Sequence, residues 1–95
     1  MPAADPSRYA LQVVRSAARA LAQTLPEAVA AAVVNFIRGD LLDRPHAVGK
    51  PLSRELAGRW SARRGEYRVI YRIDDTNRVV TVLVVEHRRS AYRRR

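Results

Sequence analysis

The chain of 95 residues contains no cysteine, one lysine and one tryptophan. Without cysteine it can form neither a structural disulfide nor a thiolate zinc site, and the absence is compatible with a reducing cytoplasm. No apolar run approaches the roughly 18 residues that a membrane-spanning helix needs. The first residues include Asp5 and Pro6 and lack the basic region of a signal peptide. We therefore expect a cytoplasmic protein with no membrane partner.

Acidic residues are scarce in only one half of the chain. The sequence has 18 basic and 9 acidic residues, a net charge of +9. Residues 1–43 hold four of each sign, so the whole excess lies in residues 44–95. This asymmetry indicates a phosphate-rich partner, an acidic protein partner or both. The alternative is a solvated basic surface in an arginine-rich proteome.

Metal and cofactor chemistry has little support in the sequence. Two histidines without any cysteine provide too few typical ligands to indicate a zinc site, and no Ser–His–Asp arrangement is visible. The Asp74-Asp75 pair stands where two strands are predicted to turn, and aspartate is a common turn residue. We expect neither a metal ion nor a cofactor.

The periodicity of apolar residues predicts an α+β fold, in which two N-terminal helices pack on a small, mostly antiparallel four-stranded sheet. We expect a single domain spanning residues 1–95, with residues 1–7 as a flexible lead. The expected elements, in order, are a strand over residues 8–14, helices over residues 16–22 and 26–38, and strands over residues 59–63, 66–74 and 79–86.

Particular residues are expected to begin and end these elements. Ser16 can cap the first helix, and Pro26 suits the first turn of the second. Gly39 is a natural end of that helix, although Leu41 and Leu42 can form a last irregular turn.

The remaining segments are predicted to be loops and turns. Residues 46–55 form a loop whose G-K-P lacks the first glycine and the hydroxyl residue of a phosphate-binding loop, so Lys50 is either a solvated cation or a ligand contact. Asn77 is expected to take the left-handed conformation in the last hairpin turn.

Alternation along the strands separates two faces of the predicted sheet. Trp60 shares a face with Tyr71 if the helices cover both, and the opposite face then carries Arg59, Arg63 and Arg68. We prefer this arrangement because an arginine is rarely buried in a core.

Several motifs resemble the RelE/ParE toxin superfamily, in particular its RelE-like branch. They are G-E-Y-R-V-I-Y-R-I over residues 65–73, the ending H-R-R-x-x-Y from His87 to Tyr92, A-R-A-L-A-Q-T-L-P over residues 18–26, and the approach to the second strand over residues 49–65. The resemblance covers nearly the whole chain.

The resemblance implies a toxin of a type II toxin–antitoxin system. RelE-like toxins enter the ribosomal A site and cleave mRNA there without a metal, which inhibits translation. The ParE branch shares the fold, inhibits DNA gyrase and lacks the cleavage residues. A third alternative is a catalytically silent member that only binds its antitoxin.

The same resemblance implies the residues of a catalytic site. Arg68 matches the arginine that binds the scissile phosphate, and Arg59 matches a basic residue near the 2′-hydroxyl. Arg88 matches a late arginine that acts as an acid or stabilises charge. Tyr92 matches a tyrosine that stacks on or orients the nucleotide. The chain departs from some relatives at Ser61, where they have a second basic residue. The remaining expected RNA contacts are Lys50, Arg54, Arg63, Arg64, Arg72 and Arg89.

His87 is the titratable candidate at this end of the sheet. Arginine is a poor general base, whereas histidine exchanges protons near neutral pH. We therefore expect His87 to share proton transfer while the arginines stabilise charge. The alternatives are that His87 only makes a backbone contact at the strand end and that Arg68 is only a surface cation.

The expected partners are the ribosome with its mRNA and an acidic, RelB-like antitoxin. Such antitoxins wrap the toxin with a helix and an extended segment. By the family pattern, the toxin reaches operator DNA only through the antitoxin complex.

Overall fold

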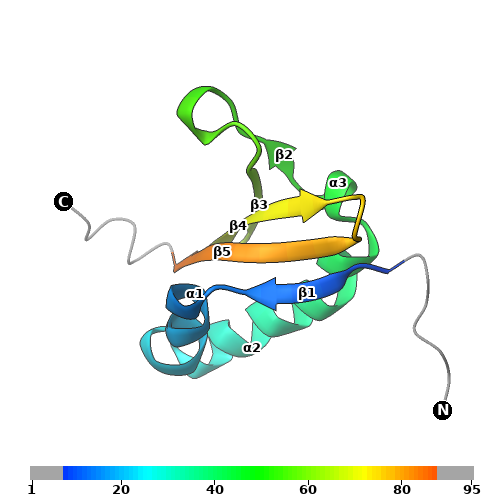
Figure 1. Cartoon of the computed structure of the whole chain (residues 1–95). Coiled ribbons are helices and arrows are strands. Elements are labelled where there is room, and N and C mark those ends of the chain that lie inside the picture. Colours follow the sequence, from blue (N-terminus) through cyan, green and yellow to red (C-terminus); the bar gives the residue numbers. More distant parts are fainter. Residues whose placement is uncertain (1–7, 88–95) are drawn as a thin grey trace, which may run out of the picture.

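The computed structural model describes residues 8–87 and contains a five-stranded sheet with the order β1-β5-β4-β3-β2 (Figure 1). The strands are β1 (Ala10–Val13), β2 (Lys50–Pro51), β3 (Trp60–Arg64), β4 (Tyr67–Asp74) and β5 (Val79–His87). β1 pairs with β5 in parallel, and the other neighbours are antiparallel. The mostly antiparallel sheet of the sequence prediction is confirmed.

Two long helical segments and a short third one lie between β1 and β2, and the two long segments cover one face of the sheet. Within residues 8–87 the helical segments are α1 (Arg15–Arg19), which runs into the wider turns of η1 (Ala20–Thr24), α2 (Glu27–Phe36), which runs into η2 (Ile37–Leu41), α3 (Pro45–Val48) and the 3-10 turn η3 (Arg54–Leu56). No helix within residues 8–87 is long and apolar enough to cross a membrane. The α+β class is thus confirmed, with the two main helices after the first strand.

Two predicted helix boundaries are wrong. Ser16 does not cap α1, because the amide of Val14 still pairs with Val82 of the sheet and the helix begins as soon as the chain leaves it. Gly39 does not end the second helix. It lies inside η2, because continuing the helix buries Ile37 and Leu41 against the sheet, and that burial exceeds the roughly 1 kcal/mol cost of a helical glycine.

The predicted loop over residues 46–55 contains structure, so the strand count of four is also wrong. Pro45 occupies the first turn of α3, where its missing N–H is harmless. Lys50 and Pro51 then pair with β3 as a fifth strand at the sheet edge, the position at which a strand tolerates proline.

The hairpin turn between β4 and β5 differs from its prediction in one residue. Asn77 donates its backbone and side-chain N–H groups to the carboxylate of Asp74, at 3.0 and 2.9 Å. The left-handed residue is Arg78, with φ 56°. The expectation for Asn77 is therefore wrong, since its hydrogen bonds to Asp74 close the turn before the chain reaches the left-handed position.

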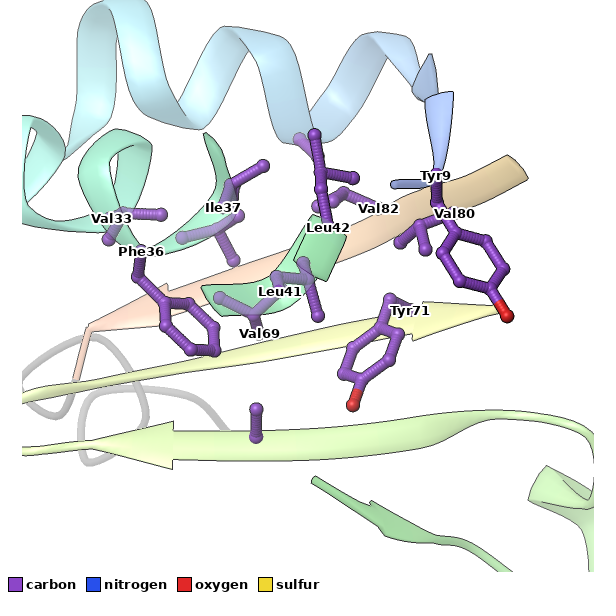
Figure 2. Close-up of a cluster of buried hydrophobic side chains, with 13 residues drawn as sticks. Tyr9, Val33, Phe36, Ile37, Leu41, Leu42, Val69, Tyr71, Val80 and Val82 are labelled. Atoms are coloured by element: carbon purple, nitrogen blue, oxygen red, sulfur yellow. The ribbon is translucent and has the colours of Figure 1, made fainter. Parts of the chain in front are cut away.

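The core lies between the helices and the sheet. Figure 2 shows side chains of α2 and η2 packed over β4 and β5. The fully buried members are Val33, Leu41, Ala62, Val69, Tyr71, Val80 and Val82. The Tyr71 hydroxyl donates to the carbonyl oxygen of Pro45 at 2.7 Å, which fixes α3 over the sheet.

Tyr71 makes stability fall at alkaline pH. Burial raises its pKa from 10.0 to about 12. The tyrosine of the unfolded chain ionises first, so the contribution is complete below pH 10 and is lost between pH 10 and 12. We expect urea unfolding to show a loss of about 3 kcal/mol across this range. The Tyr71→Phe variant should lack most of this loss, and an unchanged alkaline slope in that variant would contradict the assignment.

A second polar cluster joins the hairpin turn to β1 and α3. Asp75 accepts a hydrogen bond from the Tyr9 hydroxyl and lies 3.0 Å from Nε2 of His46. The bond from Tyr9 is the main cause that lowers the pKa of Asp75, and it also raises the pKa of Tyr9. The guanidinium of Arg78 covers the Tyr9 ring at 4.4 Å. This cluster stabilises the fold at pH values above the usual pKa of an aspartate, and the stabilisation is lost as the pH falls and Asp75 takes up a proton.

Candidate nucleic-acid interface

The face of the sheet opposite the helices carries the predicted basic residues. Ala62, Val69 and Tyr71 are buried under the helices. Because side chains alternate along a strand, Arg63 and Arg68 lie on the open face. The arrangement expected from the sequence is therefore the observed one.

One row of charged side chains crosses three strands of this open face. Glu86 on β5 pairs in register with Arg68 on β4, and Arg68 pairs with Arg63 on β3. Oε1 of Glu86 lies 2.7 Å from Nη2 of Arg68. The side chains of Arg68 and Glu86 are 40% and 18% exposed. Within residues 8–87, Nε of Arg68 is buried and has no hydrogen-bond partner.

Within residues 8–87, Nη2 of Arg68 is thus hydrogen-bonded and Nε is not. A side-on bidentate contact uses two parallel N–H groups, and Glu86 engages one side of the fork. Nε itself is closed to solvent, so a phosphate that approaches Arg68 would meet the exposed part of its side chain, which is 40% exposed.

Beside this charged row, the open face becomes partly apolar. The next row contains Lys50, Ser61, Ile70 and Val84, which are paired across β2, β3, β4 and β5. Val84 is 38% exposed, which is unusual for a valine in a central strand. The row beyond it contains Arg72, Thr81 and Gln12, with Oγ1 of Thr81 3.4 Å from Oε1 of Gln12. Arg59 precedes β3 and extends the same alternation.

Two predicted RNA contacts do not lie on the open face. Arg64 stacks its guanidinium 4.7 Å above the ring of Phe36 and donates to the carbonyl oxygens of Arg63 and Val48. It therefore belongs to the helix side of the sheet. Arg54 lies in the 3-10 turn η3 with φ 60°, outside the strands.

His87 lies on the opposite side of the sheet from Arg68. It pairs in register with Tyr67, whose ring contacts Phe36 of α2. The His87 side chain is 8% exposed, and its Nε2 lies 3.3 Å from Oε1 of Glu66. The structure does not bring His87 and Arg68 together. Arg88, Arg89 and Tyr92 lie outside the described residues.

A β-bulge decides which residue of β5 meets Arg68. From the hairpin turn, pairing runs regularly from Asp74–Val79 to Tyr71–Val82, and it then shifts by one residue so that Ile70 pairs with Val84. A regular ladder would continue with Val85 opposite Arg68, and His87 would share its face. The extra residue reverses the faces of everything after it. Sequence reasoning missed Glu86 because no sequence signal placed this bulge.

No metal site is formed by the described part of the chain. Within residues 8–87 no three of the side chains that bind metals, histidine, cysteine, aspartate and glutamate, lie close enough together to hold an ion.

A helix-covered, mostly antiparallel sheet with a basic open face is the architecture of the RelE-like toxins. A profile of the family described as "ParE toxin of type II toxin-antitoxin system, parDE" matches residues 5–92. The chain belongs to this family, and it is a RelE-family toxin of a type II toxin–antitoxin system.

Relatives and solved structures agree with this membership. Toxin RelG from Mycobacterium tuberculosis is 52% identical over 86 residues, which are 90% of this chain and 98% of RelG. Toxin RelE from the same organism is 47% identical over 89 residues, 94% of this chain and 91% of that toxin. A chain of the M. tuberculosis toxin–antitoxin complex RelBE2 superposes with a TM-score of 0.83 and 50% identity, covering 88% of this chain and 95% of that one.

Proposed function

We propose that this toxin is a ribosome-dependent endoribonuclease that cleaves mRNA in the ribosomal A site and so inhibits translation. The observation that carries the proposal is Arg68, whose side chain is 40% exposed on the open face with cationic Arg63 beside it. The identity of about half of all residues with toxins named RelG and RelE supports the same activity.

The proposed chemistry is transesterification without a metal. The 2′-hydroxyl attacks the adjacent phosphorus, so the site must take a proton, stabilise a dianionic transition state and protonate the leaving 5′-oxygen. Arg59, Arg68 and Arg88 stabilise the charge, and Tyr92 stacks on or orients the nucleotide. His87 is proposed to share proton transfer; its side chain is 8% exposed and lies on the helix side of the sheet, so the end of β5 would have to move for it to reach the phosphate.

The other cations would bind the RNA backbone. Lys50, Arg63 and Arg72 lie on the open face, Lys50 in the row that contains Val84 and the two arginines in the rows on either side of it. Arg54, Arg64 and Arg89 are proposed as outer contacts, with the guanidinium of Arg64 already engaged by Phe36. Binding through phosphates should weaken steeply with salt. Free RNA should be cut poorly, because an arginine-based site depends on the ribosome to align the 2′-oxygen with the phosphorus.

The second candidate function is inhibition of DNA gyrase. The observation that favours it is the matched family profile, which is described as a ParE toxin. This activity would need a binding surface and no cleavage chemistry, so Arg68 and His87 would be ordinary strand residues.

Primer extension on a translated mRNA separates the two functions. We expect induction of the toxin in cells to produce cuts at codon-phased positions of translated messages, and His87→Ala to reduce them at least tenfold if His87 transfers a proton. Intact mRNA together with DNA-damage signalling would refute cleavage and support gyrase inhibition. Cuts in an untranslated copy of the same RNA would contradict the dependence on the ribosome.

The proposed protein partner is an acidic, RelB-like antitoxin. The related RelBE2 structure is a toxin–antitoxin complex, which supports such a partner here. The antitoxin would neutralise the basic surface and bring the toxin to operator DNA as part of the complex. Both the ribosome and an antitoxin of this kind imply action in the cytoplasm.

A further inference from the structure

We propose that Glu86 is the general base that takes the proton from the attacking 2′-hydroxyl, an inference that rests on the proposed RNA cleavage. The bulge in β5 turns Glu86 to the open face and holds its carboxylate 2.7 Å from the guanidinium of Arg68. The same bulge turns His87 to the helix side. The group that faces the candidate phosphate site is therefore a carboxylate.

The described strands offer no second carboxylate for this role. They contain two acidic residues, Asp74 and Glu86. Asp74 ends β4 at the hairpin turn, and its carboxylate is occupied by two hydrogen bonds from Asn77. Arginine keeps its proton in proteins, so Arg63 and Arg68 can stabilise charge but cannot accept a proton.

The order Glu86, Arg68, Arg63 across the sheet fits the order of groups in the reaction. Neighbouring strands are about 4.8 Å apart, so the three side chains form a line with a carboxylate at one end. A phosphate on the exposed part of the Arg68 guanidinium would leave the carboxylate next to the ribose that bears the attacking hydroxyl. Arg63 would then lie toward the following phosphate.

The step balances without an added reactant. The O–H bond of the 2′-hydroxyl breaks and its proton passes to the Glu86 carboxylate, while the 2′-oxygen forms a bond to phosphorus. The bond from phosphorus to the 5′-oxygen breaks, and that oxygen takes a proton from solvent water, since His87 faces the helix side of the sheet.

The Glu86→Gln variant tests the base. Glutamine keeps the size and the acceptor oxygen for Arg68 but is not a base. We expect single-turnover cleavage of mRNA on programmed ribosomes to slow at least about 100-fold, with ribosome affinity within about threefold of wild type. Glu27→Gln, the same change at an exposed position on α2, is the matched control and should cleave at the wild-type rate.

Chemical rescue separates a base from a structural role. Added formate should raise the cleavage rate of the Glu86→Ala variant at least tenfold, and chloride at the same ionic strength should not raise it. If circular dichroism shows that these variants do not fold, Glu86→Asp decides: it keeps a carboxylate, withdrawn by one methylene, and should cleave at least tenfold more slowly than wild type.

The outcomes separate this inference from the function on which it rests. Wild-type protein that leaves ribosome-bound mRNA intact refutes the proposed cleavage. Wild-type cleavage with a Glu86→Gln rate within a few-fold of it refutes the role of Glu86 alone. Lost activity with weakened ribosome binding and no formate rescue, or a Glu86→Asp variant as fast as wild type, assigns Glu86 to structure and also overturns the proposal.

Discussion

The Arg68→Ala variant is expected to cleave mRNA on programmed ribosomes at least about 100-fold more slowly than wild type. The guanidinium is the proposed contact to the scissile phosphate, and its charge would be worth most as the second negative charge develops. Its position supports this role, since it is partly exposed between Glu86 and Arg63. Single-turnover cleavage with saturating toxin measures the chemical step.

Two further variants sharpen this result. Arg68→Lys keeps the charge and loses the planar fork, so we expect a loss of about tenfold or more rather than full activity. Arg44→Ala removes an exposed arginine that lies beside α3 and pairs with Asp40 at 3.8 Å, and it should cleave like wild type. An Arg68→Ala rate within threefold of wild type would show that Arg68 is a surface cation.

The Gly49→Ala variant is expected to lose at least about 2 kcal/mol of unfolding free energy. A Cβ at this position would lie 2.3 Å from the hydroxyl oxygen of Tyr71 and 2.8 Å from the carbonyl oxygen of Ser61. Tyr71 is fully buried and its hydroxyl is hydrogen-bonded to Pro45, so it cannot move aside cheaply. The cause is a close approach, since the backbone of Gly49 is extended, with φ −137°. Urea unfolding at neutral pH measures the loss.

Gly39→Ala is the matched control for this prediction. Gly39 lies in η2 with no atom within 4 Å of a built Cβ, so alanine should stabilise the helix by up to about 1 kcal/mol. Combining Gly49→Ala with Tyr71→Phe removes the nearest clashing atom and should recover part of the loss. If Gly49→Ala and Gly39→Ala unfold at the same urea concentration, the close approach at Gly49 does not affect the free energy of unfolding and the prediction is wrong.

Much of the fold follows from local patterns in the sequence. The alternation around Arg68 predicts β4 nearly to its bounds, and Asp74 and Asn77 lie in a turn as expected. The helix ends were harder to predict, because burial of Leu41 outweighs the preference of Gly39 to stop a helix. Local preferences amount to about 1 kcal/mol per residue, and packing against a sheet competes with them.

The sequence by itself determined that a basic, arginine-rich strand face exists and that Arg68 belongs to it. Local alternation is sufficient for that conclusion, because a core rarely accepts an arginine. Only the tertiary structure decided which residue of β5 stands beside Arg68. One extra residue in the ladder after Val82 brings Glu86 to the open face and carries His87 to the other. Strand register depends on pairing between distant segments, and a shift of one residue exchanges the two faces.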